Sequence, residues 1–180
     1  MFEIQRLKRI HILGAPGSGK TSLASKLSSE LGIKAYDLDS LFWDCKAPDS
    51  WTKIDSQKRN SELERITKLE SWIIEGVYYS WVQPSFKRAD VIIVVRTPVW
   101  IRHWRIIRRF IARHLGREPA IRKESLVDLI DLLRWNHGYN SKNLSSALDM
   151  LLQYEAPIIE TSGLLKTSTG LKVTKRYDFH

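Results

Sequence analysis

The sequence predicts an α/β fold in a single domain, built around a parallel β-sheet. Short apolar runs alternate with longer segments of helical periodicity, which is typical of parallel strands joined by crossover helices. A glycine-rich turn separates the first apolar run from the first helical segment. The length of 180 residues and the hydrophobic content of 43% suit one globular domain over residues 1–180.

The apolar pattern predicts five strands and five helices. The strands cover residues 9–13, 34–38, 72–75, 91–95 and 157–160, and the helices cover residues 20–31, 54–69, 98–115, 126–134 and 144–154. Gly32 stands where a C-cap glycine belongs, and Thr97 followed by Pro98 predicts an N-cap and a first helical position. The polar, basic residues beyond 163 show no pattern that predicts their structure.

Composition favours anionic partners and excludes several classes of protein. The net charge is +9, and residues 91–117 contain seven arginines but no Asp or Glu. Such a surface suits nucleotides, phosphorylated metabolites, nucleic acid or anionic lipid, although solubility alone is the plain alternative. A single cysteine excludes an internal disulfide, and no Cys/His cluster has zinc-ligand spacing. Without a leader or a membrane-length apolar run, we expect a cytoplasmic protein with no membrane partner.

The strongest motif is a phosphate-binding loop. Residues 14–21 match G-x-x-x-x-G-K-[ST] between a predicted strand and a predicted helix, which makes a chance glycine-rich turn a poor alternative. Glycines let backbone N–H groups approach phosphate oxygens, Lys20 neutralises the β- and γ-phosphates, and the Thr21 hydroxyl is a hard ligand for Mg²⁺. No Asn-Lys-x-Asp motif of GTP-binding switches is present, so we expect ATP with Mg²⁺. The candidate nucleotide-binding residues are Gly14, Ala15, Pro16, Gly17, Ser18, Gly19, Lys20, Thr21 and Ser22.

Carboxylates stand at the ends of the next two predicted strands. Asp37 and Asp39 close the second strand and Glu75, followed by Gly76, closes the third. The carboxyl ends of parallel strands form the ligand-binding edge of an open sheet. One aspartate is therefore a candidate for indirect Mg²⁺ binding or for accepting a proton from an acceptor hydroxyl, with Asp39 as a helix cap as the alternative. Glu75 resembles the carboxylate that holds Mg²⁺ through water, with an ordinary strand-end residue as the alternative.

Arginines and aromatic residues complete the candidate site. Arg102, Arg105 and Arg109 share one face of the predicted long helix, where they would bind phosphate oxygens or form a solvated basic face. Aromatic residues near the second and third strands are candidates for stacking on an acceptor ring or sugar, or for ordinary packing. These residues are Phe42, Trp43, Trp51, Trp72, Tyr78, Tyr79 and Trp81.

Four stretches resemble the adenylate-kinase-like P-loop proteins known as DNA topology modulation (FlaR-type) proteins. The stretches are residues 12–33, 36–43, 72–81 and 89–110, in the family's order. The resemblance implies a three-layer P-loop NTPase fold like that of nucleoside monophosphate kinases, with a five-stranded parallel sheet, acceptor-side helices at about residues 40–70 and a short lid at about 105–125. It implies ATP–Mg²⁺ binding by Lys20 and Thr21, an acceptor-side role for Asp39, and lid arginines at Arg105 and Arg109. Asp37 departs from the family's pattern.

The prediction is therefore a kinase that transfers the γ-phosphoryl group of ATP to a nucleotide, a nucleoside or a hydroxylated metabolite. The alternative is an ATP-dependent regulator associated with nucleic acid or DNA topology, which the lack of a DNA-reading motif disfavours. The predicted catalytic residues are Lys20, Asp39, Arg105 and Arg109, and the predicted metal-binding residues are Thr21 and Glu75. The predicted acceptor-binding residues are Asp37, Asp39, Trp43, Gly76 and Tyr78.

Overall fold

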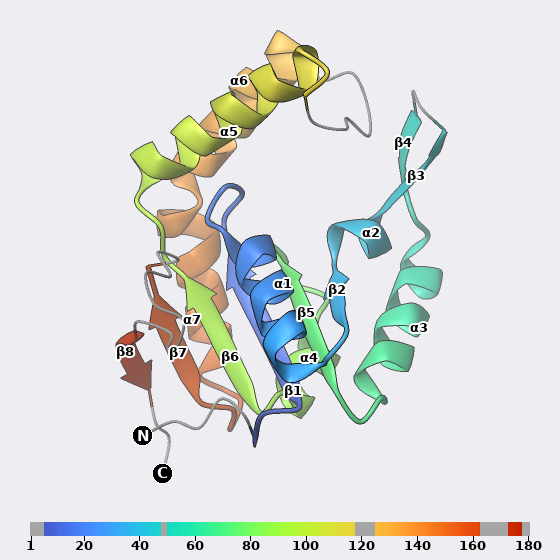
Figure 1. Ribbon diagram of the computed structural model, residues 1–180. Helices are drawn as coiled ribbons and strands as arrows, with labels where there is room; N and C mark the ends of the chain where they lie inside the picture. Colours follow the sequence, from blue (N-terminus) through green and yellow to red (C-terminus); the bar gives the residue numbers. More distant parts are fainter. Residues whose placement is uncertain (1–5, 48–49, 118–124, 163–172, 178–180) are drawn as a thin grey trace.

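The computed structural model describes residues 6–47, 50–117, 125–162 and 173–177. Its main sheet has the strand order β2-β5-β1-β6-β7-β8 (Figure 1). The first five of these are parallel, which confirms the predicted five-stranded parallel sheet. They cover Arg9–Gly14 (β1), Ala35–Asp37 (β2), Trp72–Gly76 (β5), Val91–Val95 (β6) and Ile158–Thr161 (β7). The last strand, β8 (Val173–Tyr177), pairs antiparallel with β7.

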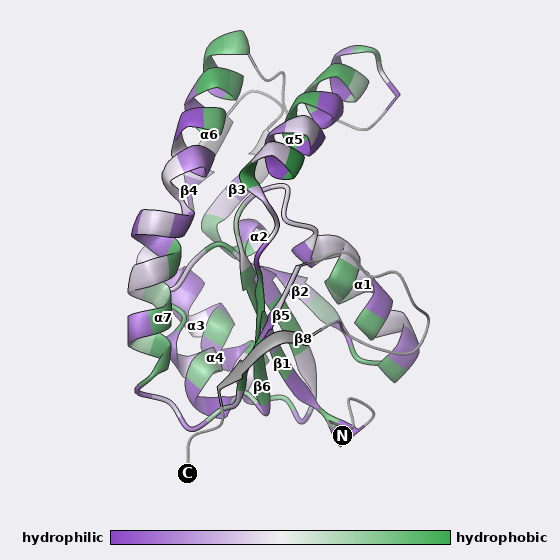
Figure 2. Cartoon of the chain, turned by 90° about the vertical axis from the view of Figure 1, so that its left-hand side faces the viewer, coloured by the Kyte–Doolittle hydropathy of each residue, from purple (hydrophilic) through white to green (hydrophobic). Residues whose placement is uncertain are grey.

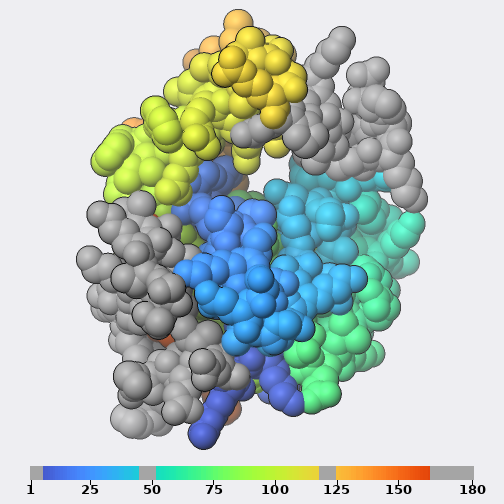
Figure 3. Space-filling model, in the orientation of Figure 1, coloured from blue at the N-terminus to red at the C-terminus, as the bar shows by residue number. Residues whose placement is uncertain are grey.

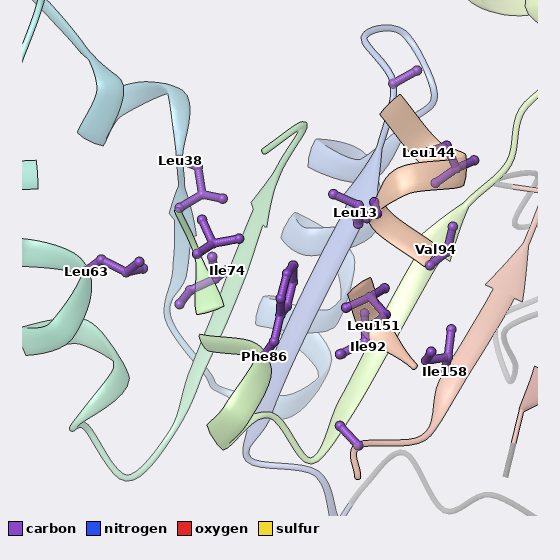
Figure 4. Packing of buried hydrophobic residues seen from close by; sticks show 14 of the residues in the cluster. Leu13, Leu38, Leu63, Ile74, Phe86, Ile92, Val94, Leu144, Leu151 and Ile158 are labelled. Atoms are coloured by element: carbon purple, nitrogen blue, oxygen red, sulfur yellow. The ribbon is translucent and has the colours of Figure 1, made fainter. Parts of the chain in front are cut away.

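Alternate residues of the central strands point to opposite faces, and each face is covered by helices. On β6, Val91, Ile93 and Val95 join the apolar cluster that contains Leu23 and Leu27 of α1 (Lys20–Leu31). The intervening residues of β6 join a second cluster, shown in Figure 4, with residues of α3 (Ser56–Thr67), α4 (Gln83–Arg88) and α7 (Ser145–Leu151). The result is a three-layer arrangement with the core on both sides of the sheet.

Two groups of elements extend beyond the carboxyl edge of the parallel strands, one on each side of it (Figure 1). One group comprises α5 (Val99–His114), α6 (Leu126–Gly138) and the π-helical segment η2 (Asn140–Leu144). The other comprises the short helix α2 (Asp39–Phe42) and the hairpin of β3 (Trp43–Ala47) and β4 (Ser50–Lys53). None of the helices in the described ranges has the length and apolar character that crossing a bilayer requires.

Some predicted boundaries and one cap are wrong. The second strand ends at Asp37 rather than at residue 38, and α4 and the β3–β4 hairpin were not predicted. Thr97 is not the N-cap of α5, because Pro98 occupies that position. The Thr97 hydroxyl instead shares its single proton between the carbonyl oxygens of Ser18, at 2.7 Å, and Ser162, at 3.0 Å. The side chain thus ties the end of β6 to the loop after β1, a tertiary role that local sequence does not reveal.

Candidate functional site

The loop between β1 and α1 has the backbone shape of a phosphate-binding nest. Gly17 and Gly19 have φ angles of 73° and 98°, a left-handed region that favours glycine. A Cβ atom on Gly17 would also lie 2.8 Å from the carbonyl oxygen of Arg102 on α5. Gly19 immediately precedes the first residue of α1, so the amino end of this helix lies at the loop. Backbone amides and the helix dipole therefore favour an anion here.

Side chains from other elements hold the loop from its carbonyl side. Asn136 Nδ2 on α6 donates to the carbonyl oxygen of Pro16 at 2.7 Å. Arg105 Nη1 on α5 donates to the carbonyl oxygens of Gly17 and Ser18, both at 3.1 Å. The C=O and N–H groups of a trans peptide point in opposite directions. Because these hydrogen bonds hold the carbonyl oxygens toward α5 and α6, the N–H groups of the same peptides point away from those helices. An anion nest needs N–H groups oriented in this way.

Lys20, Thr21 and Glu75 form a compact polar group beneath the loop. Glu75 on β5 and Lys20 at the start of α1 are buried, with exposed fractions of 3% and 8%. Lys20 Nζ lies 3.9 Å from Glu75 Oε2, so the two buried charges offset each other. The Thr21 hydroxyl donates to Glu75 Oε1 at 2.6 Å. The structure thus brings together both predicted metal-binding residues, Thr21 and Glu75.

Hydroxyl and carboxylate oxygens are the hard donors that Mg²⁺ prefers, so this pair fits a magnesium ion. Within the described ranges, no group of three or more His, Cys, Asp or Glu side chains is arranged to hold a metal.

Asp37 and Asp39 lie beside this group, on the neighbouring strand and the turn after it. Asp37 pairs in register with Glu75, and its Oδ1 accepts a hydrogen bond from the Asp39 amide at 2.8 Å. Partial desolvation and repulsion from Glu75 raise the pKa of Asp37 to about 6. The side chain of Asp39 does not cap α2, whose N-cap is Leu38. The predicted alternative of Asp39 as a helix cap is therefore wrong.

Tyr78 connects Asp39 to a group of aromatic rings. Its hydroxyl donates a hydrogen bond to Asp39, and burial followed by the Asp39 charge raises the pKa of Tyr78. The Tyr78 ring stacks on Phe42, with centroids 4.9 Å apart, and Phe42 also contacts Trp43 edge-on. Gly76 has a packing role, because a Cβ atom there would lie 2.8 Å from Cβ of Leu38. Asp39, Trp43 and Tyr78 thus lie together, while Gly76 makes room for the turn that carries Asp39.

Sequence reasoning missed Arg59 and underrated Phe42 and Trp81. The Arg59 guanidinium lies 4.3 Å from the Trp81 ring centroid and 5.4 Å from that of Phe42. Arg59 lies on α3, in a segment whose many charges predict only an exposed helix. No spacing rule joins residue 59 to residue 81, so the sequence carries no local signal for this contact.

Two arginines of α5, Arg102 and Arg105, face the protein rather than open solvent. Arg102 is 1% exposed and donates to Asn140 Oδ1 at 3.0 Å and to the Asn136 carbonyl oxygen at 3.1 Å. Arg105 binds the loop carbonyls described above, and Arg109 is half-buried one helical turn farther along. The predicted shared face is therefore present, but Arg102 and Arg105 use it to bind main-chain oxygens. A solvated basic face does not describe these two residues.

The surface is hollowed between α5 and α1, on the side that also borders the α2 region (Figure 3). The sheet order β2-β5-β1 places Asp37, Glu75 and the loop after β1 side by side at this edge. A separate groove of about 380 Å³, between α3, α4 and Tyr154, contains none of the predicted site residues. The candidate site is therefore the carboxyl edge of the parallel strands, as expected for an open α/β sheet.

Known proteins are similar to this chain in sequence or in fold. An uncharacterized protein of Bacillus subtilis (strain 168), YqaC, is 32% identical over 139 residues, 76% of this chain and 75% of that protein. The cytidylate kinase of Aeropyrum pernix is 27% identical over 110 residues, 54% of this chain and 62% of that enzyme.

Among solved structures, the shikimate kinase of Bacteroides thetaiotaomicron aligns over 90% of both chains with a TM-score of 0.53 and 15% identity. This match shows a shared fold, that of a P-loop kinase. The profile of the family described as "AAA domain" matches residues 10–118, which include the phosphate-binding loop, the carboxylates at the sheet edge and α5. That match spans more than half of the chain, and the protein therefore belongs to the AAA-domain family, as a P-loop protein with a kinase-like fold.

Proposed function

We propose that this protein is an ATP-dependent kinase that phosphorylates a hydroxyl or phosphate oxygen of a small acceptor. The observation that carries the proposal is the contact of Thr21 and Lys20 with buried Glu75, beside a pair of aspartates at the next strand end. One half of this arrangement suits a metal-bound triphosphate and the other half suits an acceptor. Their adjacency is what phosphoryl transfer requires, because the reaction depends mainly on positioning and charge stabilisation.

The nucleotide half consists of the loop amides, Lys20, Thr21 and Glu75. In the proposed complex the amides and Lys20 bind the β- and γ-phosphates, while Thr21 and, through water, Glu75 hold Mg²⁺. The ion would neutralise charge that develops on the transferring phosphoryl group. We place the adenine near the end of β7, at about residues 160–163, of which residue 163 lies outside the described ranges.

The acceptor half consists of Asp39, Asp37, Trp43 and Tyr78, with Gly76 behind them. Asp39 would accept the proton of the acceptor hydroxyl as its oxygen attacks the γ-phosphorus and the bond to the bridging oxygen of ADP breaks. The hydrogen bond from Tyr78 orients the Asp39 carboxylate. A phosphate acceptor needs no proton removed, so Asp39 would then only orient it. Asp37 is proposed to bind a polar group of the acceptor.

Arg105 and Arg109 are proposed to stabilise charge on the phosphates. Arg105 is anchored on the loop carbonyls, so its fixed cation adds positive potential directly behind the nest. Arg109 would act from the next turn of α5, as part of a lid at about residues 105–125. Residues 118–124 of that lid lie outside the described ranges.

The acceptor class is proposed on the chemistry of the aromatic group. Flat rings beside a carboxylate suit a nucleotide base or a hydroxylated ring, so nucleotides, nucleosides and hydroxylated metabolites are the substrates to test. The resemblance to DNA topology modulation proteins adds no reaction to this scheme, and no observation favours a nucleic-acid regulator.

The test is an acceptor panel scored by ADP release, with nucleoside monophosphates, nucleosides and hydroxylated acids or sugars as separate arms. We expect one arm to stimulate ADP release at least tenfold over the rate without acceptor, and Lys20→Ala to abolish the stimulation. Lys26→Ala, at a half-buried lysine of the same helix that pairs with Glu30 rather than with the loop, should behave like the wild type. Tight ATP–Mg²⁺ binding with no stimulation in any arm would contradict the kinase proposal and leave only nucleotide binding.

A further inference from the structure

The helix α5 is unusual because it carries large apolar side chains on its outward side as well as on its buried side. Its buried side chains include Arg102, together with Ile106 and Phe110. The opposite side carries large apolar residues with exposed fractions between 39% and 74%. These residues, here called the α5 outer stripe, are Trp100, Trp104, Ile107, Ile111 and Leu115. A surface helix ordinarily turns such a stripe toward the core.

The spacing of the outer stripe suits a second helix. Its members are separated by four, three, four and four residues, which follows the a/d pattern of paired helices over residues 100–111. At 100° per residue the stripe spans about 80°, narrower than the apolar face of a helix that packs on a core. Both α5 and α6 project beyond the sheet (Figure 2), and the exposed fractions of the stripe residues show that the outer side of α5 is open to solvent.

The exposed area is sufficient for a homodimer. If a fully exposed side chain of this size offers about 200 Å², the stripe exposes about 550 Å² per protomer. Two stripes packed together would bury about 1,100 Å² in all, above the roughly 1,000 Å² expected of a specific interface. A contiguous apolar patch near 550 Å² is at the upper end for a monomer, where such patches often have a function.

Charge argues against the anionic partners that the composition favours. Arg102 and Arg105 of α5 bind the P-loop side of the molecule, so they do not flank the stripe. Arg108 lies at one edge of the stripe, with its guanidinium 5.3 Å from the Trp104 ring centroid. Of the seven arginines of residues 91–117, Arg102 and Arg105 are therefore turned away from the stripe, and a lipid or nucleic-acid surface on the stripe would not contact them. We propose that the α5 outer stripe is the interface of a two-fold homodimer, formed by two α5 helices.

The experiment is sedimentation equilibrium of the full chain between 1 and 100 μM. We expect the mass of the wild type to rise with concentration from that of one 21.0 kDa chain toward twice that value. The double variant Trp104→Glu/Ile111→Glu should remain at the mass of one chain, with a dimer dissociation constant at least 100-fold higher than that of the wild type. Leu152→Glu, which changes an exposed leucine next to α7, should dimerise like the wild type. Circular dichroism and thermal unfolding verify that each variant folds.

The salt dependence of dimerisation and binding to vesicles distinguish a homodimer from other partners of the stripe. Raising NaCl from 0.1 to 0.5 M should preserve or strengthen the dimer, because apolar contacts dominate and salt screens the two Arg108 charges. A wild type that stays monomeric at 100 μM, or a dimer that the double variant leaves intact, overturns the proposal. So does a monomer that floats with phosphatidylglycerol vesicles only when the stripe is intact. If the double variant does not fold, Ile107→Ser/Ile111→Ser replaces it, with the same expected loss of dimer.

Discussion

The nucleotide half and the acceptor half of the candidate site are built in different ways. The nucleotide half comes almost wholly from eight consecutive residues, 14–21, whose glycines and helix start place the amides, Lys20 and Thr21 together. The acceptor half draws on two separate segments, residues 37–43 and residues 76–78, with Arg59 of α3 packed on the adjoining aromatic rings. A continuous motif specifies its own geometry, whereas a composite surface depends on the sheet order that brings its segments together.

Glu75 is where the two halves meet. It contacts Thr21 and Lys20 on one side and pairs in register with Asp37 on the other. Its charge is offset by Lys20 and also contributes to the raised pKa of Asp37. We therefore expect changes in the nucleotide half to have large effects that pass into the acceptor half, and changes at the far aromatic side to have small, separable ones.

The largest effect is expected for Lys20→Ala. Loss of the ammonium group removes the cation at the phosphates and leaves Glu75 buried without its counter-charge. We expect kcat/KM to fall by about 10³-fold or more, as for other preorganised charge-stabilising groups. Steady-state kinetics and ATP binding by calorimetry measure this, with Lys26→Ala as the matched control. A loss of less than tenfold would mean that the motif is not the centre of the nucleotide half.

Asp39→Asn should affect the acceptor half alone. The amide keeps the shape of the side chain but accepts no proton, so kcat with a hydroxyl acceptor should fall by about 10²-fold or more. ATP affinity should stay within twofold of the wild type. Asp149→Asn, on the exposed side of α7, controls for loss of a surface charge. Weaker ATP binding in Asp39→Asn would show that the two halves are not separable at this residue.

The same contrast explains what the sequence could predict. The P-loop, the parallel strands and the position of Glu75 at a strand end were predictable because periodicity and spacing along the chain determine them. The roles of Thr97, Asn136 and Arg105 were not, because each binds a loop carbonyl contributed by a segment at least 79 residues away. Asp39 was predicted as a site residue on the assumption of an extended strand, although the chain turns into α2 at Leu38. Long-range contacts and short turns, rather than the elements themselves, limited the prediction.

An effect of intermediate size is expected on the pH dependence of folding stability, which limits the pH range in which the two halves can be compared. His11 on β1 is fully buried, and its Nδ1 donates to Ser85 Oγ at 2.8 Å, because the Ser85 hydroxyl donates to the Val82 carbonyl oxygen. Burial lowers the pKa of His11 from 6.5 to about 3. Between these values the unfolded chain binds a proton that the folded chain does not, so stability is lost as the pH falls below 6.5.

Because of His11, the free energy of unfolding should be about 2 kcal/mol lower at pH 5 than at pH 7 or above. Urea unfolding at pH 7 and pH 5 measures the difference. His11→Gln should be less sensitive to pH by that amount, while His137→Gln, which alters an exposed histidine, should follow the wild type. If the pH dependence of the unfolding free energy is unchanged in His11→Gln, groups other than His11 cause the loss of stability in acid. Activity lost near pH 5 would then be tested at the carboxylates of the site.

The smallest effect is expected for Tyr78→Phe, which tests whether the aromatic side orients the proton acceptor. The ring and its stacking on Phe42 remain, but the hydrogen bond to Asp39 is lost. A hydrogen bond to a charged group contributes about 1.5 kcal/mol, so kcat should fall about tenfold while KM for ATP stays unchanged. Tyr79→Phe, at the adjacent position, is the control and should change neither parameter. A packing role would survive the loss of one hydroxyl. An unaltered kcat in Tyr78→Phe would therefore mean that this tyrosine packs against the site without orienting Asp39. A tenfold loss confined to kcat would instead tie the aromatic side to the chemical step, through the hydroxyl oxygen of Tyr78.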